Sequence, residues 1–131
     1  MISYALSGAL MILASPLVNA WPLVAVALAP AIAGFWQDSG LSASAAQPRR
    51  YWRIVLGGYL VGLCYAASHF YWLIEFKPAW LFPVLAGFAL MPAILGLAVS
   101  LAVGAGLRGF ALLVWTTLSW TAIEVLASDL W

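Results

Sequence analysis

Residues 79–105 read AWLFPVLAGFALMPAILGLAVSLAVGA, a stretch without a single charged side chain. A helix needs roughly 20 apolar residues to cross the hydrocarbon core of a bilayer, so this stretch predicts a membrane-spanning helix. The composition of the whole chain agrees, because 66% of its 131 residues are hydrophobic and only 7% are charged. In a soluble domain about 25% of the residues are charged. The sequence therefore predicts an integral membrane protein.

Further apolar runs lie on both sides of this stretch, and prolines, glycines or short polar segments separate them. Each run is close to the length of one span, so we predict an all-α fold, a polytopic transmembrane helical bundle of about five spans. Residues 1–131 then form a single transmembrane domain. The predicted spans are residues 2–18, 21–36, 51–73, 79–105 and 110–127. Residues 37–48 are rich in Ser, Ala and Gly, a composition that predicts a flexible aqueous loop.

The third predicted span contains two glycines four residues apart, Gly58 and Gly62. Small residues at this spacing lie on one face of a helix and allow the backbone of another helix to approach closely. In a bilayer such close packing is a main source of helix association, because lipid tails are as apolar as leucine. We therefore expect a second helix to pack against these glycines.

The basic residues predict the orientation of the spans. Arg49, Arg50 and Arg53 follow the second predicted span, and Arg108 separates the fourth from the fifth. In a five-span chain these two segments lie on the same side, and cytoplasmic segments carry an excess of Lys and Arg. We therefore predict a cytoplasmic N-terminus and a C-terminus on the outer face of the membrane, with Lys77 as the exception. We also expect the four arginines to contact lipid head groups.

Glu124 lies well inside the fifth predicted span. A carboxylate within a membrane is costly, and it marks either a functional site or a pairing with another helix. Thr117 and Thr121 precede Glu124 by seven and three residues, which places all three on nearly the same helix face. We interpret this face as a surface for helix association or for function. The alternative is that Glu124 only extends to the aqueous interface.

His69 lies near the end of the third predicted span. A neutral imidazole is a good metal or pigment ligand, but no second histidine and no cluster of acidic residues accompanies it. We therefore favour a hydrogen-bonded histidine at the membrane interface over pigment ligation. We predict no metal site and no cofactor, while the apolar surface leaves room for a bound lipid.

The sequence offers no set of catalytic residues. The chain has one cysteine, Cys64, inside an apolar run, together with one histidine and four acidic residues. No Gly-rich phosphate loop, nucleophile elbow or metal-ligand motif is present. The net charge of +1 gives no basis for nucleic-acid binding. From the residues alone we expect a membrane protein that has membrane lipids and other membrane-protein subunits as its partners.

The order of the motifs resembles the N-terminal membrane region of apolipoprotein N-acyltransferase. That family has a small-residue apolar helix, a proline turn, a Trp-Pro-Leu run, a basic loop, a Gly-rich helix ending in Tyr-Trp, and a helix with a Trp and a Glu. The matching segments here are residues 7–10, 15–16, 21–30, 49–50, 57–62 and 71–73, and the pair Trp120 and Glu124. The resemblance covers nearly the whole chain, and it implies a location in the bacterial inner membrane.

The resemblance also implies a phospholipid-dependent acyl transfer to lipoproteins, but the family's catalytic Glu, Lys and Cys lie in an outer domain. No segment here matches that domain, and Cys64 lies inside a predicted span. The Arg-Gly that follows the glutamate in the family is Ala127-Ser128 here. We expect a membrane module of this type without catalytic residues of its own. The alternative is a small non-catalytic accessory subunit of a larger membrane complex, photosynthetic or respiratory, that mediates helix packing and assembly.

Overall fold

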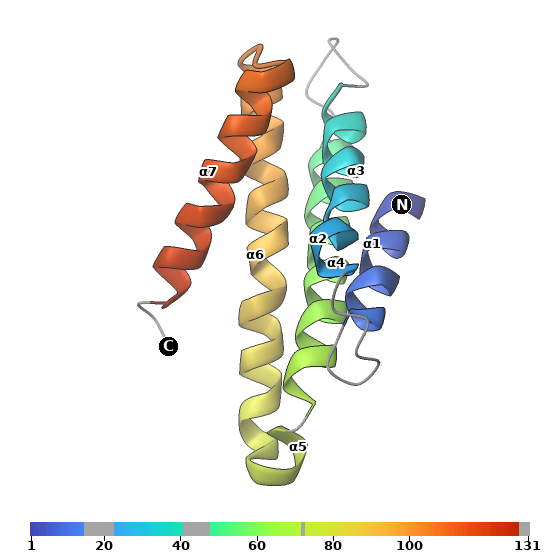
Figure 1. Cartoon of the computed structure of the whole chain (residues 1–131), viewed down its shortest axis with the longest axis vertical. Helices are drawn as coiled ribbons and strands as arrows, with labels where there is room; N and C mark the ends of the chain where they lie inside the picture. Colours follow the sequence, from blue (N-terminus) through green and yellow to red (C-terminus); the bar gives the residue numbers. More distant parts are fainter. Residues whose placement is uncertain (15–22, 41–47, 72, 129–131) are drawn as a thin grey trace.

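The computed structural model describes residues 1–14, 23–40, 48–71 and 73–128, and every regular element in these ranges is a helix (Figure 1). The helices are α1 (Ile2–Leu13), α2 (Val24–Ala27), α3 (Ala29–Gly40), α4 (Pro48–Phe70), α5 (Leu73–Phe76), α6 (Pro78–Gly104) and α7 (Gly109–Ser128). The prediction of an all-α fold is confirmed. The predicted boundary between the first two spans, at residues 15–22, lies outside the described residues.

Two of the described helices are long and apolar enough to cross a membrane, namely α6 and residues Gly109–Ala127 of α7. They agree within one residue at each end with the ranges predicted from sequence, 79–105 and 110–127. The apolar helix α1 is shorter, at 12 residues. Helix α4 has 23 residues, but the arginines of its first turns and the polar residues of its last turn make it less apolar than α6 and α7.

The second predicted span is not one helix. The chain turns at Leu28, between α2 and α3, because Pro30 has no backbone N–H and its ring would clash with the carbonyl group four residues earlier. Helix α3 then continues to Gly40, so residues 37–40 are helical and the predicted aqueous loop is wrong for these four positions. The rest of that loop, residues 41–47, lies outside the described residues.

The third predicted span, residues 51–73, is displaced toward the N-terminus. Helix α4 begins at Pro48, which suits the first turn of a helix because the missing N–H needs no partner there. The predicted assignment of Arg49 and Arg50 to a loop is therefore wrong, since both lie in the first turn of α4. The helix ends at Phe70, and a separate short helix, α5, follows.

The centre of the bundle is the contact between α4 and α6, the most extensive one in the structure. A Cβ atom at Gly62 would lie 2.5 Å from the Cα of Ala89, and one at Gly58 would lie 2.7 Å from the Cα of Ala93. The two backbones thus approach closely along two small-residue pairs. The helix contact expected at Gly58 and Gly62 is confirmed, and the partner helix is α6.

A second close contact holds α1 in the bundle. The ring of Tyr4 fits between Gly34 of α3 and Gly57 of α4, whose Cβ atoms would lie 3.1 Å and 2.5 Å from it. The Tyr4 ring also packs against Phe35, at 5.4 Å between ring centroids. The side chain of Tyr4 is only 2% exposed. Two glycines on different helices therefore provide the slot that places its hydroxyl group.

That hydroxyl group belongs to a buried polar network near the end of α3. Tyr4 donates a hydrogen bond to Oδ2 of Asp38 at 2.9 Å, and Arg53 forms an ion pair with Oδ1 of Asp38 at 3.1 Å. Asp38 is 8% exposed, whereas the Arg53 side chain is 55% exposed. The network links α1, α3 and α4, and its pairing explains how a carboxylate is buried here.

The turn from α6 to α7 is formed by glycines with positive φ, 90° at Gly106 and 53° at Gly109. The backbone N–H of Leu107 donates to the carbonyl group of Ala102, and that of Gly106 donates to Val103. This is the Schellman arrangement, which requires a left-handed residue after the helix. Glycine adopts that conformation without strain, which explains why Gly106 stands at this position of the turn.

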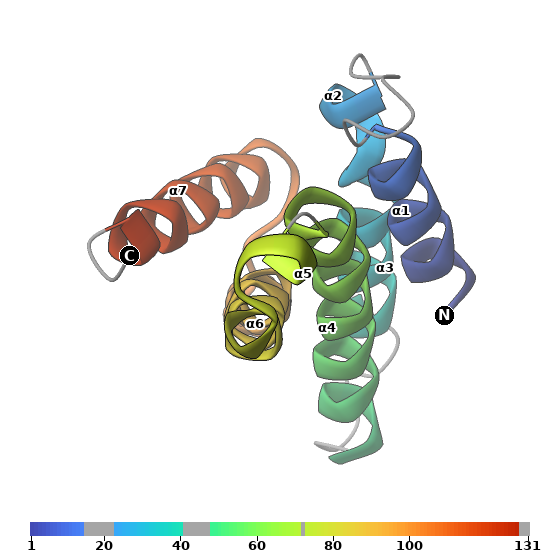
Figure 2. The same cartoon turned by 90° about the horizontal axis from the view of Figure 1, so that it is seen from below.

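Helix α7 packs mainly against α6 and diverges from the rest of the bundle (Figures 1 and 2). The indole N–H of Trp115 donates to the carbonyl group of Ala98, at 3.0 Å, and ties the two helices together. Only 11% of the apolar stretch of α7 is buried. The C-terminal ends of α3 and α6 lie at one end of the molecule, and α5 lies at the opposite end (Figure 1).

Candidate functional site

A cavity of about 460 Å³ lies between the diverging α7 and the other helices. It is lined by residues of α1, α4, α6 and α7 and by the junction of α2 and α3: Met11, Leu28, Val61, Tyr65, Phe88, Met91, Pro92, Trp120, Glu124 and Ala127. Eight of these ten side chains carry no hydroxyl or carboxylate group. Tyr65 and Glu124 are the exceptions, and they are the polar side chains of a mainly apolar cavity.

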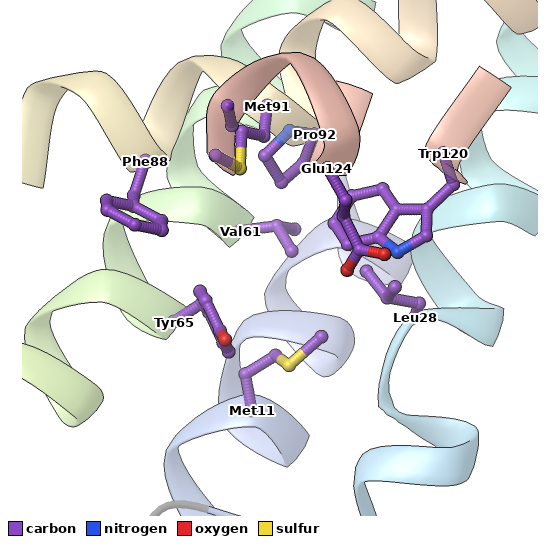
Figure 3. Close-up of a pocket in the computed structure, with 10 residues that line it drawn as sticks. Met11, Leu28, Val61, Tyr65, Phe88, Met91, Pro92, Trp120 and Glu124 are labelled. Carbon is purple, nitrogen blue, oxygen red and sulfur yellow. The ribbon is translucent and has the colours of Figure 1, made fainter. Parts of the chain in front are cut away.

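Figure 3 shows how these two polar side chains lie. Tyr65 comes from α4 and Glu124 from α7, and both project into the cavity from its two sides. Trp120 lies one turn before Glu124 on α7 and lines the same side. Among the described residues no ion pair or hydrogen bond to the Glu124 carboxylate is found. The carboxylate is therefore available to a hydrogen-bond donor in the cavity.

The two threonines predicted to share a surface with Glu124 use their hydroxyl groups within α7. Thr117 donates to the carbonyl group of Leu113 at 3.0 Å, and Thr121 donates to that of Thr117 at 3.1 Å. Such bonds to the preceding turn are typical of Thr in membrane helices. Both threonines are exposed, and neither lines the cavity. Of the predicted polar face, the structure places only Glu124 in the cavity.

His69 lies in the last turn of α4, four residues after Tyr65. Its Nδ1 donates a hydrogen bond to the carbonyl group of Tyr65 at 3.0 Å, and its ring lies 4.2 Å from the Tyr65 ring, centroid to centroid. Ser68 also lies within 3.3 Å of Nδ1. His69 therefore contacts Tyr65 without being one of the residues that line the cavity. In the described ranges no group of three His, Cys, Asp or Glu residues is arranged to hold a metal ion.

The structure describes the side chains of two of the four arginines that were expected at lipid head groups, and both are engaged within the protein. Arg53 pairs with Asp38. Arg108 donates to the carbonyl groups of Val103 and Leu107, at 2.9 Å and 2.8 Å. It thus adds hydrogen bonds to carbonyl groups at the end of α6 and in the turn that follows, where a cation is favoured by the helix dipole. The side chains of Arg49 and Arg50 are outside the described set.

Cys64 is positioned for packing. Its Sγ atom lies 3.0 Å from where a Cβ atom of Gly8 would be, so it fills the contact between α4 and α1. The two polar side chains of the cavity, Tyr65 and Glu124, come from different helices. Among the described residues that line the cavity, no cysteine or serine lies beside a base.

The sequence analysis did not predict two features of the structure. Tyr65 lines the cavity with Glu124 and contacts the ring of His69, and its spacing of four residues from His69 on a predicted helix was the available signal. The pairing of Asp38 with Arg53 joins residues on two helices that only the tertiary structure brings together. The signal there was weaker, because Asp38 lies at the start of a stretch with loop composition.

Comparison with known protein families identifies a family to which this chain is similar. A family model described as the apolipoprotein N-acyltransferase N-terminal domain matches residues 7–131. The match includes α4, α6 and α7 in full, and with them the helices that contribute Tyr65 and Glu124. No significant match is found among the curated proteins or among the solved structures.

Proposed function

The chain belongs to the family of the apolipoprotein N-acyltransferase N-terminal domain, and on this premise we propose that it is a membrane-embedded helical module of lipoprotein biosynthesis. In this proposal the module lies in the bacterial inner membrane and supplies the intramembrane part of an acyltransferase. Its own residues do not perform the transfer. The observation that carries this proposal is the cavity, which is lined for binding and lacks a nucleophile beside a base.

The proposal includes five spans, of which α4 is the one with the least apolar sequence. Exposed aromatic residues support α4 as a span, because Trp and Tyr are enriched where helices leave the membrane. Trp52 is 71% exposed near the start of α4, and Tyr71 is 42% exposed just after its end. At 1.5 Å per residue these positions are about 28 Å apart. The hydrocarbon core of a bilayer is about 30 Å thick.

The orientation in this proposal has the N-terminus in the cytoplasm and the C-terminus in the periplasm. The start of α4 with its three arginines and the turn with Arg108 lie at the same end of the bundle, opposite α5 (Figure 1). An excess of Lys and Arg marks the cytoplasmic side. Glu75 and Lys77, both exposed, then lie on the periplasmic side.

We predict that the purified chain, by itself, transfers no acyl group. Incubation with phospholipid and a diacylated lipopeptide should give no triacylated product by mass spectrometry, because Cys64 is packed between α4 and α1. A complete enzyme of the family serves as the positive control. Turnover that is detectable and survives Cys64→Ala would contradict the proposal, since an acyl-transfer centre would then exist elsewhere in the chain.

A second candidate function is that of an accessory subunit that mediates helix packing in a larger membrane complex. The exposed surface of α7 favours it, because Phe110, Leu118 and Leu126 are 79%, 62% and 66% exposed. Such a surface suits either lipid or a neighbouring helix. In this alternative the chain forms a stable complex with other membrane proteins through α7 and has no role in acyl transfer.

A further inference from the structure

Helix α7 is held near its start and only loosely toward its end. Its buried residues, Leu112 and Thr116, lie in its first half, where the indole N–H of Trp115 also donates to the carbonyl group of Ala98 on α6. Between residues 117 and 127 no side chain of α7 is buried. Figure 2 shows this part of the helix diverging from the rest of the bundle. The fixed point of α7 is therefore close to its N-terminus.

The backbone at the start of α7 has the features of a pivot. Gly109 has a φ of 53°, a conformation that strains other residues. The hydrogen bond from the N–H of Leu112 to the carbonyl group of Arg108 is 3.4 Å long, beyond the usual range of about 2.7–3.2 Å. A Cβ atom at Gly109 would meet nothing within 4 Å, so the bundle does not pack against this position. A small change in the backbone angles there would tilt α7 as a rigid rod.

The effect of such a tilt differs along α7. Glu124 lies 15 residues after Gly109, about 22 Å along the axis, so a tilt of about 10° moves it by about 4 Å. Trp115 lies about 9 Å from Gly109 and moves by less than about 2 Å. Tilts of transmembrane helices range over about 0–40°, so a change of this size is modest. The tilt therefore moves Glu124 while Trp115 stays close to α6.

Two polar side chains on opposite sides of the cavity give the tilt a direction. Tyr65 of α4 and Glu124 of α7 both project into the cavity (Figure 3). Among the described residues, neither the Tyr65 hydroxyl group nor the Glu124 carboxylate forms a hydrogen bond. A phenol and a carboxylate within a membrane are both stabilised when they pair. The cavity of about 460 Å³ that both residues line provides the room for α7 to approach α4.

We propose that α7 is a hinged helix that closes on the bundle about Gly109, and that the Tyr65 hydroxyl group donates a hydrogen bond to the Glu124 carboxylate in the closed state. The present structure is the open state. Closure narrows the space between α7 and α4, so the hinge controls access to the cavity from the side. This inference rests on the membrane embedding proposed above, because such a pair contributes less when water competes for both groups.

The test measures one distance far from the pivot and one close to it. In a Cys64→Ala background, Leu60→Cys is combined with either Leu126→Cys or Phe110→Cys, all at exposed positions, and nitroxide labels are attached. The full chain is placed in nanodiscs of phosphatidylethanolamine and phosphatidylglycerol. Double electron–electron resonance should give two distances for positions 60 and 126, about 4 Å apart, and one distance for positions 60 and 110. A single distance for both pairs would overturn the hinge.

Variants of the polar pair separate closure from an undirected motion of α7. Tyr65→Phe and Glu124→Leu should each lower the ratio of closed to open chains roughly two- to tenfold, which is the effect of one hydrogen bond. Thr121→Val is the matched control on the same helix, because its hydroxyl group is bonded to the carbonyl group of Thr117, and it should leave the ratio unchanged. An equal effect of Tyr65→Phe and Thr121→Val would overturn the role of the pair.

A measurement without cysteine substitutions avoids dependence on the labels. The chain is produced with 3-fluorotyrosine, its five tyrosines are followed by fluorine NMR, and the Tyr65 signal is assigned by its loss in Tyr65→Phe. We expect two signals or exchange broadening for Tyr65 and one sharp signal for Tyr4, which is 2% exposed. One sharp Tyr65 signal that Glu124→Leu does not shift would overturn the proposal. A failure of the membrane embedding is distinguishable, because topology labelling reports it independently of these signals.

Discussion

Replacing Gly62 with alanine should force α4 and α6 apart and destabilise the folded chain. The added Cβ atom would lie 2.5 Å from the Cα and 2.6 Å from the carbonyl oxygen of Ala89, and backbone atoms at this distance cannot move without moving the helix. Overpacking of this kind costs about 1–3 kcal/mol. Gly58→Ala meets the backbone of Pro92 and Ala93 in the same way. We expect the double variant to lose stable folding, as measured by thermal unfolding in detergent with Trp fluorescence.

Gly104→Ala is the matched control, because a Cβ atom at Gly104 would have nothing within 4 Å. Alanine favours a helix over glycine by up to about 1 kcal/mol, so this variant should be as stable as the original chain or slightly more stable. If Gly62→Ala unfolds at the same temperature as Gly104→Ala, the close contact of the α4 and α6 backbones is wrong.

Arg53→Leu should leave the carboxylate of Asp38, which is 8% exposed, with the hydroxyl group of Tyr4 as its one partner among the described residues. Removing one member of a fully buried ion pair costs about 3–5 kcal/mol. The Arg53 side chain is 55% exposed, so solvent weakens the pair, and we expect a loss of about 2–3 kcal/mol in the free energy of unfolding.

The matched control for this prediction removes the charge from both partners. In Arg53→Leu/Asp38→Asn the neutral amide still accepts the hydrogen bond from Tyr4, and no buried charge is left unpaired. The double variant should therefore be more stable than Arg53→Leu alone in the same thermal measurement. A double variant that is equally unstable or less stable would show that the ion pair does not account for the burial of Asp38.

The helices that the sequence predicted best are those bounded by strong local signals. The apolar run of α6 begins after Lys77, at Pro78, and the turn at Gly106 separates α6 from α7. The limits of both helices therefore follow from hydrophobicity and from the left-handed backbone conformation that glycine allows. The small-residue spacing of Gly58 and Gly62 also predicted a helix contact. It did not identify Ala89 and Ala93 as the partners, because many small residues in this chain have the same spacing.

The features that the sequence did not predict depend on tertiary contacts. Asp38 lies in a stretch of loop composition, and it becomes helical and buried only because Tyr4 and Arg53 meet its carboxylate from two other helices. Glu124 could be recognised from the sequence, because a charged residue inside an apolar run is energetically costly. The sequence did not predict that Glu124 and Tyr65 line the same cavity, because no sequence pattern specifies how far α7 diverges from α4.

The most direct test of the central claim, that this bundle spans a bilayer, follows α4 from end to end. In a Cys64→Ala background, single cysteines are placed at Trp52, Leu60 and Tyr71, which are all exposed, and intact cells are treated with a membrane-impermeant maleimide. We predict labelling at position 71 from outside, labelling at position 52 only after permeabilisation, and none at position 60 in either case. Labelling of positions 52 and 71 from the same side would contradict the account.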